Sequence, residues 1–225
     1  FLDPEGGEIR IGFPHSLGIH LIPTVVAEFR KRYPNVKFRF KQGMYPSLIR
    51  DVLAGEVDLA FVSPFPDRHD HVEGDVVLTE ELFAVLPPNH PLASAEHITL
   101  SQLKGEKFIL FRDGYSLRPI VWQACLEAGF TPDIAFEGEE TDTIRGLVAA
   151  GMGVSLLPEM ALFQTNPLQP ARVSIVDPEV TRTIGLIHRR DDKLPLVAKS
   201  FRTFLLQYFG LHGNAATSNK TAKAD

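Results

Sequence analysis

The chain has 225 residues, enough for one large domain or for two domains of roughly 100 residues each. Hydrophobic residues make up 44% and charged residues 23% of the sequence, as in ordinary globular proteins. The formal net charge is −5, with both signs mixed along the chain, so this fragment lacks the basic balance with which a protein grips nucleic acid. No apolar run approaches the roughly 18 residues of a membrane span, so we expect no membrane partner.

The single cysteine, Cys125, excludes an internal disulfide. Its neighbours at helical spacing are apolar, so we interpret it as a small buried helix residue rather than a reactive thiol. A reducing, cytoplasmic location fits this cysteine usage. The chain starts at Phe1 without a signal-like leader, and we expect it to be a piece of a longer protein, cut just before the first strand.

Residues 7–42 predict a strand, a turn, a helix and a second strand. Apolar residues alternate with polar or small ones over 9–13 and again over 36–41, which is typical of strands. Between them, an apolar stripe over 21–33 recurs every three or four residues and predicts a helix. Units of this kind build parallel sheets, in which ligands bind outside the carboxyl ends of the strands. The turn at 14–18 is therefore the first candidate binding site.

A comparable set of elements recurs in the second half of the chain. Further elements of the first half are a helix over 46–54, strands over 57–62 and 82–86, and a polar, turn-rich segment over 67–75. The second half predicts strands over 107–111, 133–136, 154–158, 172–176 and 183–188, with helices over 117–128, 141–150 and 195–209.

The repetition predicts an α/β protein with two Rossmann-like lobes and a ligand-binding cleft between them, as in two-lobed binding proteins of the periplasmic-binding-protein type (type 2). We expect lobe I to comprise 1–86 plus 188–210 and lobe II to comprise 87–187. The strands ending at Leu86 and at 183–188 are the candidate crossings between lobes, and the last helix should return to lobe I. Residues 211–225 are small and polar, which predicts a disordered tail.

Five segments resemble the effector-binding domain of LysR-type transcriptional regulators over residues 4–209. Each segment alone is weak evidence, whereas five in the order and spacing of the family are strong evidence. The segments are Gly7–Gly12, Leu21–Pro34, Leu53–Ala60, Asn89–Leu92 and Val148–Pro158.

The resemblance implies a regulator that is not an enzyme and that binds promoter DNA through an N-terminal winged helix-turn-helix domain absent from this fragment. It also implies a homodimer or homotetramer in which a helix of one lobe lies against the other lobe of the partner. The apolar stripes at 21–33 and 117–128 are candidates for this contact, although both also suit the core. A narrower resemblance at 13–17, 39–43 and 137–139 points to activators of glutamate-synthase operons, so 2-oxoglutarate and glutamate are the first candidate effectors.

In lobe I, the candidate effector-binding residues are Pro14, His15, Ser16 and Leu17 at the first turn, with Ser63 and Pro64 at the carboxyl end of a strand. Ser16 can cap the following helix, and a helix N-terminus also attracts a carboxylate. His15 offers a donor that protonation can switch, or it faces solvent.

In lobe II, the turn at Gly114, Tyr115 and Ser116 repeats this arrangement. Arg118 can hold a ligand carboxylate with two hydrogen bonds, or it forms a surface ion pair. Phe111 lines the site or fills the core. The acidic run Glu137–Glu140, with Glu137 as the candidate contact, can bind an amino group or lie on the rim of the cleft, or it is solvated.

Enzyme motifs are absent from the sequence, which has no nucleophile elbow, no P-loop and no dinucleotide fingerprint. The Asp67–His71 segment carries metal-ligand side chains, but we interpret it as a solvated loop. We therefore expect neither a metal nor a cofactor. The hypothesis is an effector-sensing and oligomerising domain, and the alternative is a solute-binding receptor of a transport system.

Overall fold

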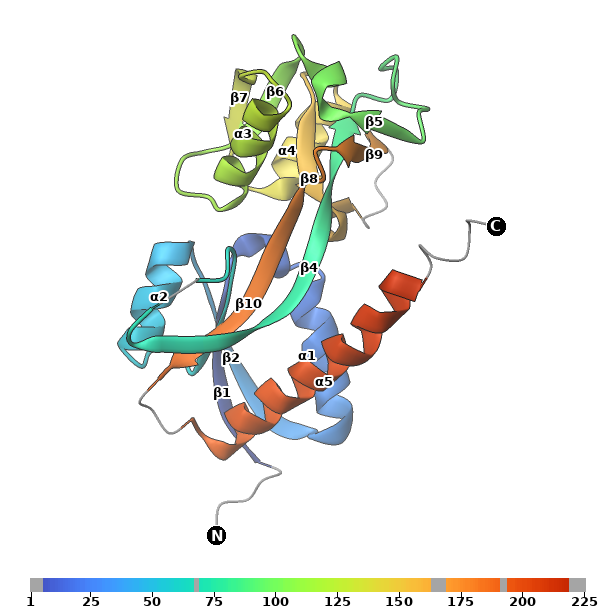
Figure 1. The fold of residues 1–225 in the computed structure, drawn as a ribbon. Coiled ribbons are helices and arrows are strands. Elements are labelled where there is room, and N and C mark those ends of the chain that lie inside the picture. Colours follow the sequence, from blue (N-terminus) through green and yellow to red (C-terminus); the bar gives the residue numbers. More distant parts are fainter. Residues whose placement is uncertain (1–5, 67–68, 163–168, 191–193, 219–225) are drawn as a thin grey trace. The chain divides into compact units, whose positions relative to one another are not determined.

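The computed structural model describes residues 6–66, 69–162, 169–190 and 194–218, the last eight by backbone alone. Residues Phe1–Thr79 with Thr183–Asp225 form one compact unit, and Glu80–Arg182 form a second. We call these unit 1 and unit 2 (Figure 1). The chain passes between them inside two strands, β4 (Val72–Leu86) and β10 (Thr181–Arg189).

Unit 1 is built on a mixed sheet. Strand β1 pairs in parallel with β2 on one side and with β3 on the other, and β10 pairs antiparallel with β3. The sheet order is β2-β1-β3-β10-β4, so β2 is an outer strand. The bounds of the elements introduced here are β1 (Gly6–Phe13), β2 (Asn35–Gln42) and β3 (Leu59–Val62).

The two faces of this sheet are covered by different helices. The alternation of side-chain direction along β1 shows which helix covers which face. A Cβ added to Gly7 would lie 3.2 Å from Val197 of α5 (Leu196–Ser218), whereas one added to Gly12 would lie 2.9 Å from Leu48 of α2 (Tyr45–Leu53). Because successive residues of a strand point to opposite faces, α5 and α2 cover opposite faces. Helix α1 (Leu21–Arg32) packs with α5.

An aromatic cluster joins these helices to the sheet. Phe29 of α1 lies with its ring centroid 5.0 Å from that of Phe201 and 5.4 Å from that of Phe204, both on α5. Phe38 of β2 lies 5.5 Å from Phe201. The edge-to-face geometry of these pairs adds to their burial. The last helix therefore packs on unit 1.

Unit 2 contains the second strand–helix–strand repeat and antiparallel strands around it. Strand β6 (Lys107–Phe111) pairs in parallel with β7 (Asp133–Gly138), and Phe108 forms a bridge to Val154. Beyond Glu80, β4 pairs with β8 and β9, and β5 pairs with β9. The remaining elements are β5 (His97–Thr99), η2 (Leu100–Leu103), α3 (Leu117–Glu127), α4 (Thr141–Ala149), β8 (Ser155–Pro158), η3 (Glu159–Leu162) and β9 (Ala171–Asp177).

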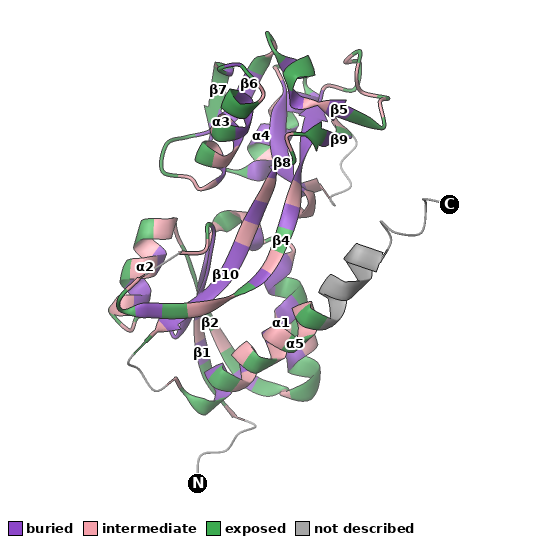
Figure 2. Ribbon diagram, in the orientation of Figure 1, coloured by how far each residue is buried: buried purple, intermediate pink, exposed green. Residues whose placement is uncertain are grey.

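One continuous apolar core fills unit 2, with buried residues concentrated on its strands (Figure 2). It includes Phe111, whose side chain is 3% exposed, and Cys125, which is fully buried. The same core contains Leu117 and Val121 of α3. The buried part of the apolar stripe of this helix therefore lies in the core of unit 2.

A buried ion pair lies where β4 and β10 enter unit 2. The Arg182 guanidinium contacts the Glu80 carboxylate at 2.5 Å, and the two side chains are 0% and 6% exposed. The second oxygen of Glu80 accepts a hydrogen bond from the backbone N–H of Met160 at 3.2 Å. Two partners on the carboxylate offset part of the desolvation that burial imposes on these charges.

Two sequence predictions differ from the structure. Strand β4 begins at Val72, ten residues earlier than predicted, because Gly74 lets the strand pass close to β10: an added Cβ would lie 2.1 Å from the carbonyl oxygen of Leu186. Helix α5 continues to Ser218, so the backbone of 211–218 is helical where an irregular tail is expected. Residues 219–225 lie outside the described residues.

Among the described helices, none combines the length and the apolar character that crossing a membrane requires.

Candidate functional site

The turn after β1 in unit 1 is tighter than the sequence predicts. Residues His15–Leu17 form a short 3-10 helix, η1, in which the N–H of Leu17 donates to the carbonyl oxygen of Pro14 at 3.0 Å. Leu17 is 1% exposed and anchors this turn in the core, while His15 is exposed. The turn is thus held in place by one apolar side chain.

The prediction that Ser16 caps the following helix is wrong. Helix α1 starts at Leu21 with His20 at its N-cap position, and Ser16 lies inside η1. The reason is that the chain makes a separate 3-10 turn before α1, so the capping position falls four residues later. Ser16 remains half-buried at the carboxyl end of β1.

Ser63 follows β3 at the same edge of the sheet as η1. Strands β1 and β3 run parallel, with Gly12 opposite Ala60, so their carboxyl ends lie side by side. Ser63 is 2% exposed, and its hydroxyl has no hydrogen-bond partner among the described residues. Pro64, next to it, is exposed. A buried hydroxyl without a partner carries a desolvation cost that a bound ligand would relieve.

In unit 2, the turn from Arg112 to Ser116 links β6 to α3. Gly114 adopts a φ of 91°, a left-handed conformation that glycine reaches without strain. Ser116 lies at the N-cap position of α3, as predicted, but its side chain makes no capping hydrogen bond. The first N–H groups of α3 are therefore not satisfied by this hydroxyl, and the positive end of the helix dipole lies at the turn.

Arg118 is held by three contacts within unit 2. Its side chain is 16% exposed, with Nε 2.7 Å from Asp113 Oδ1 and Nη1 2.5 Å from Glu137 Oε1. Nη1 also donates to the carbonyl oxygen of Phe111 at 2.7 Å. The ion pair that the sequence offers as an alternative is therefore formed, and the guanidinium is oriented by the backbone at the end of β6.

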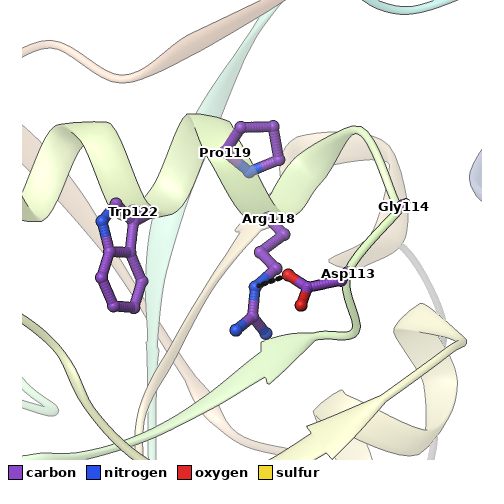
Figure 3. A pocket seen from close by; sticks show the side chains of 5 residues that line it. All are labelled: Asp113, Gly114, Arg118, Pro119 and Trp122. Atoms are coloured by element: carbon purple, nitrogen blue, oxygen red, sulfur yellow. Dashed lines mark ion pairs between the residues drawn. The ribbon is translucent and has the colours of Figure 1, made fainter.

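A cavity of about 470 Å³ opens beside this guanidinium (Figure 3). Pro119 and the Trp122 indole form its apolar lining, and Asp113, Gly114 and Arg118 form the rest. Asp113 is 92% exposed, so its contact with Arg118 is a solvated ion pair of small net stability.

Tyr115 lies in the same turn and contacts Phe111 and Glu139. Its ring stacks on Phe111 with centroids 6.1 Å apart, and its hydroxyl donates to Glu139 at 3.3 Å. Burial, followed by the nearby negative charge of Glu139, raises the pKa of Tyr115 above its ordinary value of 10.0. The phenol is thus a neutral donor at physiological pH.

The structure brings the predicted residues of each unit together but adds others that sequence reasoning misses. Asp113 and Trp122 line the cavity beside Arg118 in unit 2, and neither their spacing nor their type signals this from the sequence. In contrast, Phe111 contributes its carbonyl oxygen while its side chain lies in the core. Within the described residues, no three histidine, cysteine, aspartate or glutamate side chains gather as metal ligands would, and Asp67 lies outside those residues.

Comparison with known proteins identifies the family. The model of the LysR substrate binding domain matches residues 3–210. The transcriptional dual regulator GltC of Bacillus subtilis (strain 168) is 41% identical over 209 residues, covering 93% of this chain and 70% of that protein. The transcriptional dual regulator OxyR of Escherichia coli (strain K12) is 28% identical, covering 81% of this chain and 60% of that protein.

A solved structure shares the fold. The effector-binding domain of QuiR in complex with shikimate superposes with a TM-score of 0.81 at 29% identity, covering 92% of this chain and 99% of that one. Domains of this type have the two-lobed, type 2 periplasmic-binding-protein-like fold, which confirms the predicted fold class. The resemblance drawn from the sequence is likewise confirmed, and the chain belongs to the LysR-type transcriptional regulators as their substrate-binding, or effector-binding, domain.

Proposed function

We propose that this domain senses a small carboxylate metabolite through the turns at the carboxyl ends of β1, β3 and β6. The observation that carries the proposal is the Arg118 guanidinium, oriented by the Phe111 carbonyl oxygen at the mouth of a cavity with an apolar wall. A fixed guanidinium beside a helix N-terminus suits a carboxylate. The residues proposed to contact the effector are Pro14, His15, Ser16, Leu17, Ser63, Pro64, Gly114, Tyr115, Ser116, Arg118 and Glu137.

The two units would serve one effector. Each supplies a turn after a parallel strand, and each turn presents a serine, Ser16 or Ser116, near a helix start. Glu137 beside Arg118 adds an acceptor for an amino group. We propose 2-oxoglutarate and glutamate as the first candidates, by the narrower similarity to activators of glutamate-synthase operons and by this pairing of guanidinium with carboxylate.

The mechanism would be a linkage between effector binding and assembly. An effector that binds one arrangement of the domains more tightly shifts the population toward that arrangement. In a homodimer or homotetramer, such a shift would change the spacing of DNA-binding domains on a promoter in the cytoplasm. Since members of this family regulate transcription and are not enzymes, binding rather than turnover is the expected output.

The alternative of a solute-binding receptor is not supported. The matched relatives are transcription regulators, and the two-lobed fold is common to both classes of protein. Fold alone does not define function, so the family membership decides between them.

Calorimetric titration of the domain with 2-oxoglutarate, glutamate and a panel of other small carboxylates tests the proposal. We expect saturable binding of one of them, weakened on the order of ten- to a hundredfold by Arg118→Gln, because a charged hydrogen bond is lost. Arg172→Gln is the matched control, since Arg172 pairs with Glu159 outside the turn in the same unit. Absence of binding across the panel would contradict a carboxylate effector.

A further inference from the structure

A further cavity lies in unit 1, away from the turns proposed to bind the effector. Its volume is about 220 Å³, and its charged lining residues in the described part of the chain are Arg10, Asp58 and Arg189. Two positive charges and one negative charge give a balance of +1. Asp58 directly precedes β3, whereas Ser63 directly follows it, so this cavity lies at the opposite edge of the sheet from Ser63 and η1.

The three charged side chains form a row across neighbouring strands. Strands β1 and β10 both pair with β3 at Ala60. Two residues further toward this edge, the same register places Arg10, Asp58 and Arg189 side by side. Residues two apart on a strand point to the same face, which here is the face that α2 covers, since Gly12 belongs to the Ala60 row. The order of the strands therefore gives a row of positive, negative and positive charge.

Contacts with the end of α2 and with β3 fix the orientation of Arg10. Its Nη2 lies 2.6 Å from Asp58 Oδ1, and its Nε donates to Asp58 Oδ2 at 3.3 Å. Its Nη1 donates to the carbonyl oxygen of Gly55 at 2.6 Å. The Asp58 side chain is 5% exposed, whereas that of Arg10 is 38% exposed. The aspartate is therefore neutralised from one side, and an oriented guanidinium reaches the cavity.

Arg189, at the end of β10, supplies the second guanidinium. Its side chain is half-buried, and its Nη1 donates to the carbonyl oxygen of Leu53 at 3.4 Å. This distance exceeds the usual range of an N–H···O hydrogen bond, about 2.7–3.2 Å. An oxygen of an anion is a stronger acceptor for a guanidinium than a neutral carbonyl oxygen is. The contact with α2 therefore does not by itself account for a second positive charge at this cavity.

The start of α5 adds to the positive potential of the two guanidinium groups. Leu194 and Pro195 line the cavity just before this helix begins. The N–H of Lys199 donates to the carbonyl oxygen of Pro195 at 3.0 Å, which is the first hydrogen bond of the helix. The positive end of the helix dipole therefore lies at the cavity and has the same sign as the excess charge of the arginines.

We propose that this cavity binds a small phosphate-type oxyanion between the guanidinium groups of Arg10 and Arg189. The two residues are two strand spacings apart, about 9–10 Å between backbones, so their side chains can hold one tetrahedral ion from two sides. The planar fork of donors on each guanidinium matches phosphate oxygens. The ion is either inorganic phosphate or the phosphoryl group of a phosphomonoester. Because Ser63 and the other effector candidates lie elsewhere, the domain can hold this ion and an effector together.

Calorimetric titration of the domain with inorganic phosphate tests the proposal. We expect one phosphate per chain with a dissociation constant below about 1 mM. Arg189→Gln should weaken binding at least about tenfold, because charge-assisted hydrogen bonds are lost, and Arg189→Lys should weaken it less, because the charge remains. Arg190→Gln is the matched control and should leave the affinity unchanged, since the Arg190 guanidinium donates to the carbonyl oxygens of His69 and Val72 instead.

A parallel titration with glycerol 3-phosphate distinguishes the two sources of the ion. Tighter binding of the ester would assign the cavity to the phosphoryl group of a metabolite, and tighter binding of inorganic phosphate would assign it to the ion itself; both support the proposal. Amide NMR spectra of the wild-type domain give a second readout that does not depend on a variant. The signals of Gly55 and Asp58 should shift on addition of phosphate, while that of Gly114 should not.

Three results would overturn the proposal: no saturable binding of either phosphate compound, an equal loss of affinity with Arg190→Gln, or phosphate binding that Arg189→Gln retains and Arg118→Gln abolishes. The last result would assign the ion to the turn after β6. The proposal does not depend on the identity of the effector. Arg189→Gln should retain the carboxylate binding that Arg118→Gln weakens, so failure of either proposal is recognised separately from failure of the other.

Discussion

Arg118 shows how one side chain is oriented by the residues around it. Its Nη1 donates to the carbonyl oxygen of Phe111, which fixes the guanidinium to the end of β6. Its ion pairs with Asp113 and Glu137 neutralise its charge within unit 2. Because the guanidinium is already oriented, less conformational entropy would be lost when an effector binds.

Cys125 is expected to be chemically inert in the folded domain. Burial raises the pKa of its thiol from 9.0 to about 12, so the reactive thiolate is scarce. We predict that a thiol reagent at pH 8 modifies the native domain far more slowly than the unfolded chain. Rapid modification, or formation of a peroxide-dependent product, would contradict the burial.

The raised pKa of Cys125 also predicts how the stability of the domain depends on pH. Because the folded pKa of Cys125 exceeds the unfolded value, its contribution to stability is complete below about pH 9 and is lost as the pH rises toward 12. We expect Cys125→Ala to remove this part of the alkaline decline in the free energy of unfolding, measured by urea denaturation at pH 8 and pH 10.5. An identical decline in the variant would assign it to other groups.

Glu80→Gln is expected to destabilise unit 2 by about 3–5 kcal/mol, because it leaves the Arg182 charge buried without its counter-ion. Urea denaturation measures this loss. The control replaces both partners, Glu80→Leu with Arg182→Met, and should cost much less, since no uncompensated charge remains. Equal losses of unfolding free energy in the single and double variants would mean that the loss arises from packing rather than from an uncompensated charge.

At the scale of elements, Phe201 is a fully buried aromatic side chain through which α5 packs on unit 1. Phe201 is 0% exposed and contacts both Phe29 and Phe38. We predict that Phe201→Ala lowers the free energy of unfolding by about 3–5 kcal/mol through lost burial and a cavity. Phe204→Ala is the matched control: this ring is only half-buried, so its loss should cost less. Equal costs would contradict the packing described here.

Elements with strong periodicity could be predicted from the sequence, and elements shaped by distant contacts could not. The alternation in β1 and the stripe of α1 are local signals, and both elements are confirmed. The first half of β4 has weak alternation. The need for glycine at position 74 arises from the close approach of Leu186 on β10, which the local sequence does not indicate. The 3-10 turn η1 is stabilised by burial of Leu17, which no local sequence pattern predicts.

Some features of the candidate site could likewise be predicted from the sequence, and others could not. The turns and their serines follow from sequence because they lie at strand ends next to helices. The partners of Arg118 do not follow, since Glu137 is 19 positions away on β7. The pair between Glu80 and Arg182 spans 102 positions, and only the assembled unit 2 brings them together.

On the scale of the whole molecule, the chain consists of two units joined through β4 and β10, each with a turn that follows a parallel strand. The central claim is that a single effector uses both turns. If so, affinity for that effector should depend on residues from both units, and changes in either unit should weaken the same binding event.

The most direct measurement is calorimetric titration of one effector into Ser16→Ala, from unit 1, and Ser116→Ala, from unit 2, beside the wild-type domain. We predict that each variant binds the same effector with unchanged stoichiometry and with affinity weakened about five- to tenfold, as expected for loss of one hydrogen bond. Ser200→Ala, which changes a serine that bonds only within α5, should leave the affinity unchanged. Loss of affinity in one variant alone would show that the effector binds within a single unit and would contradict the account.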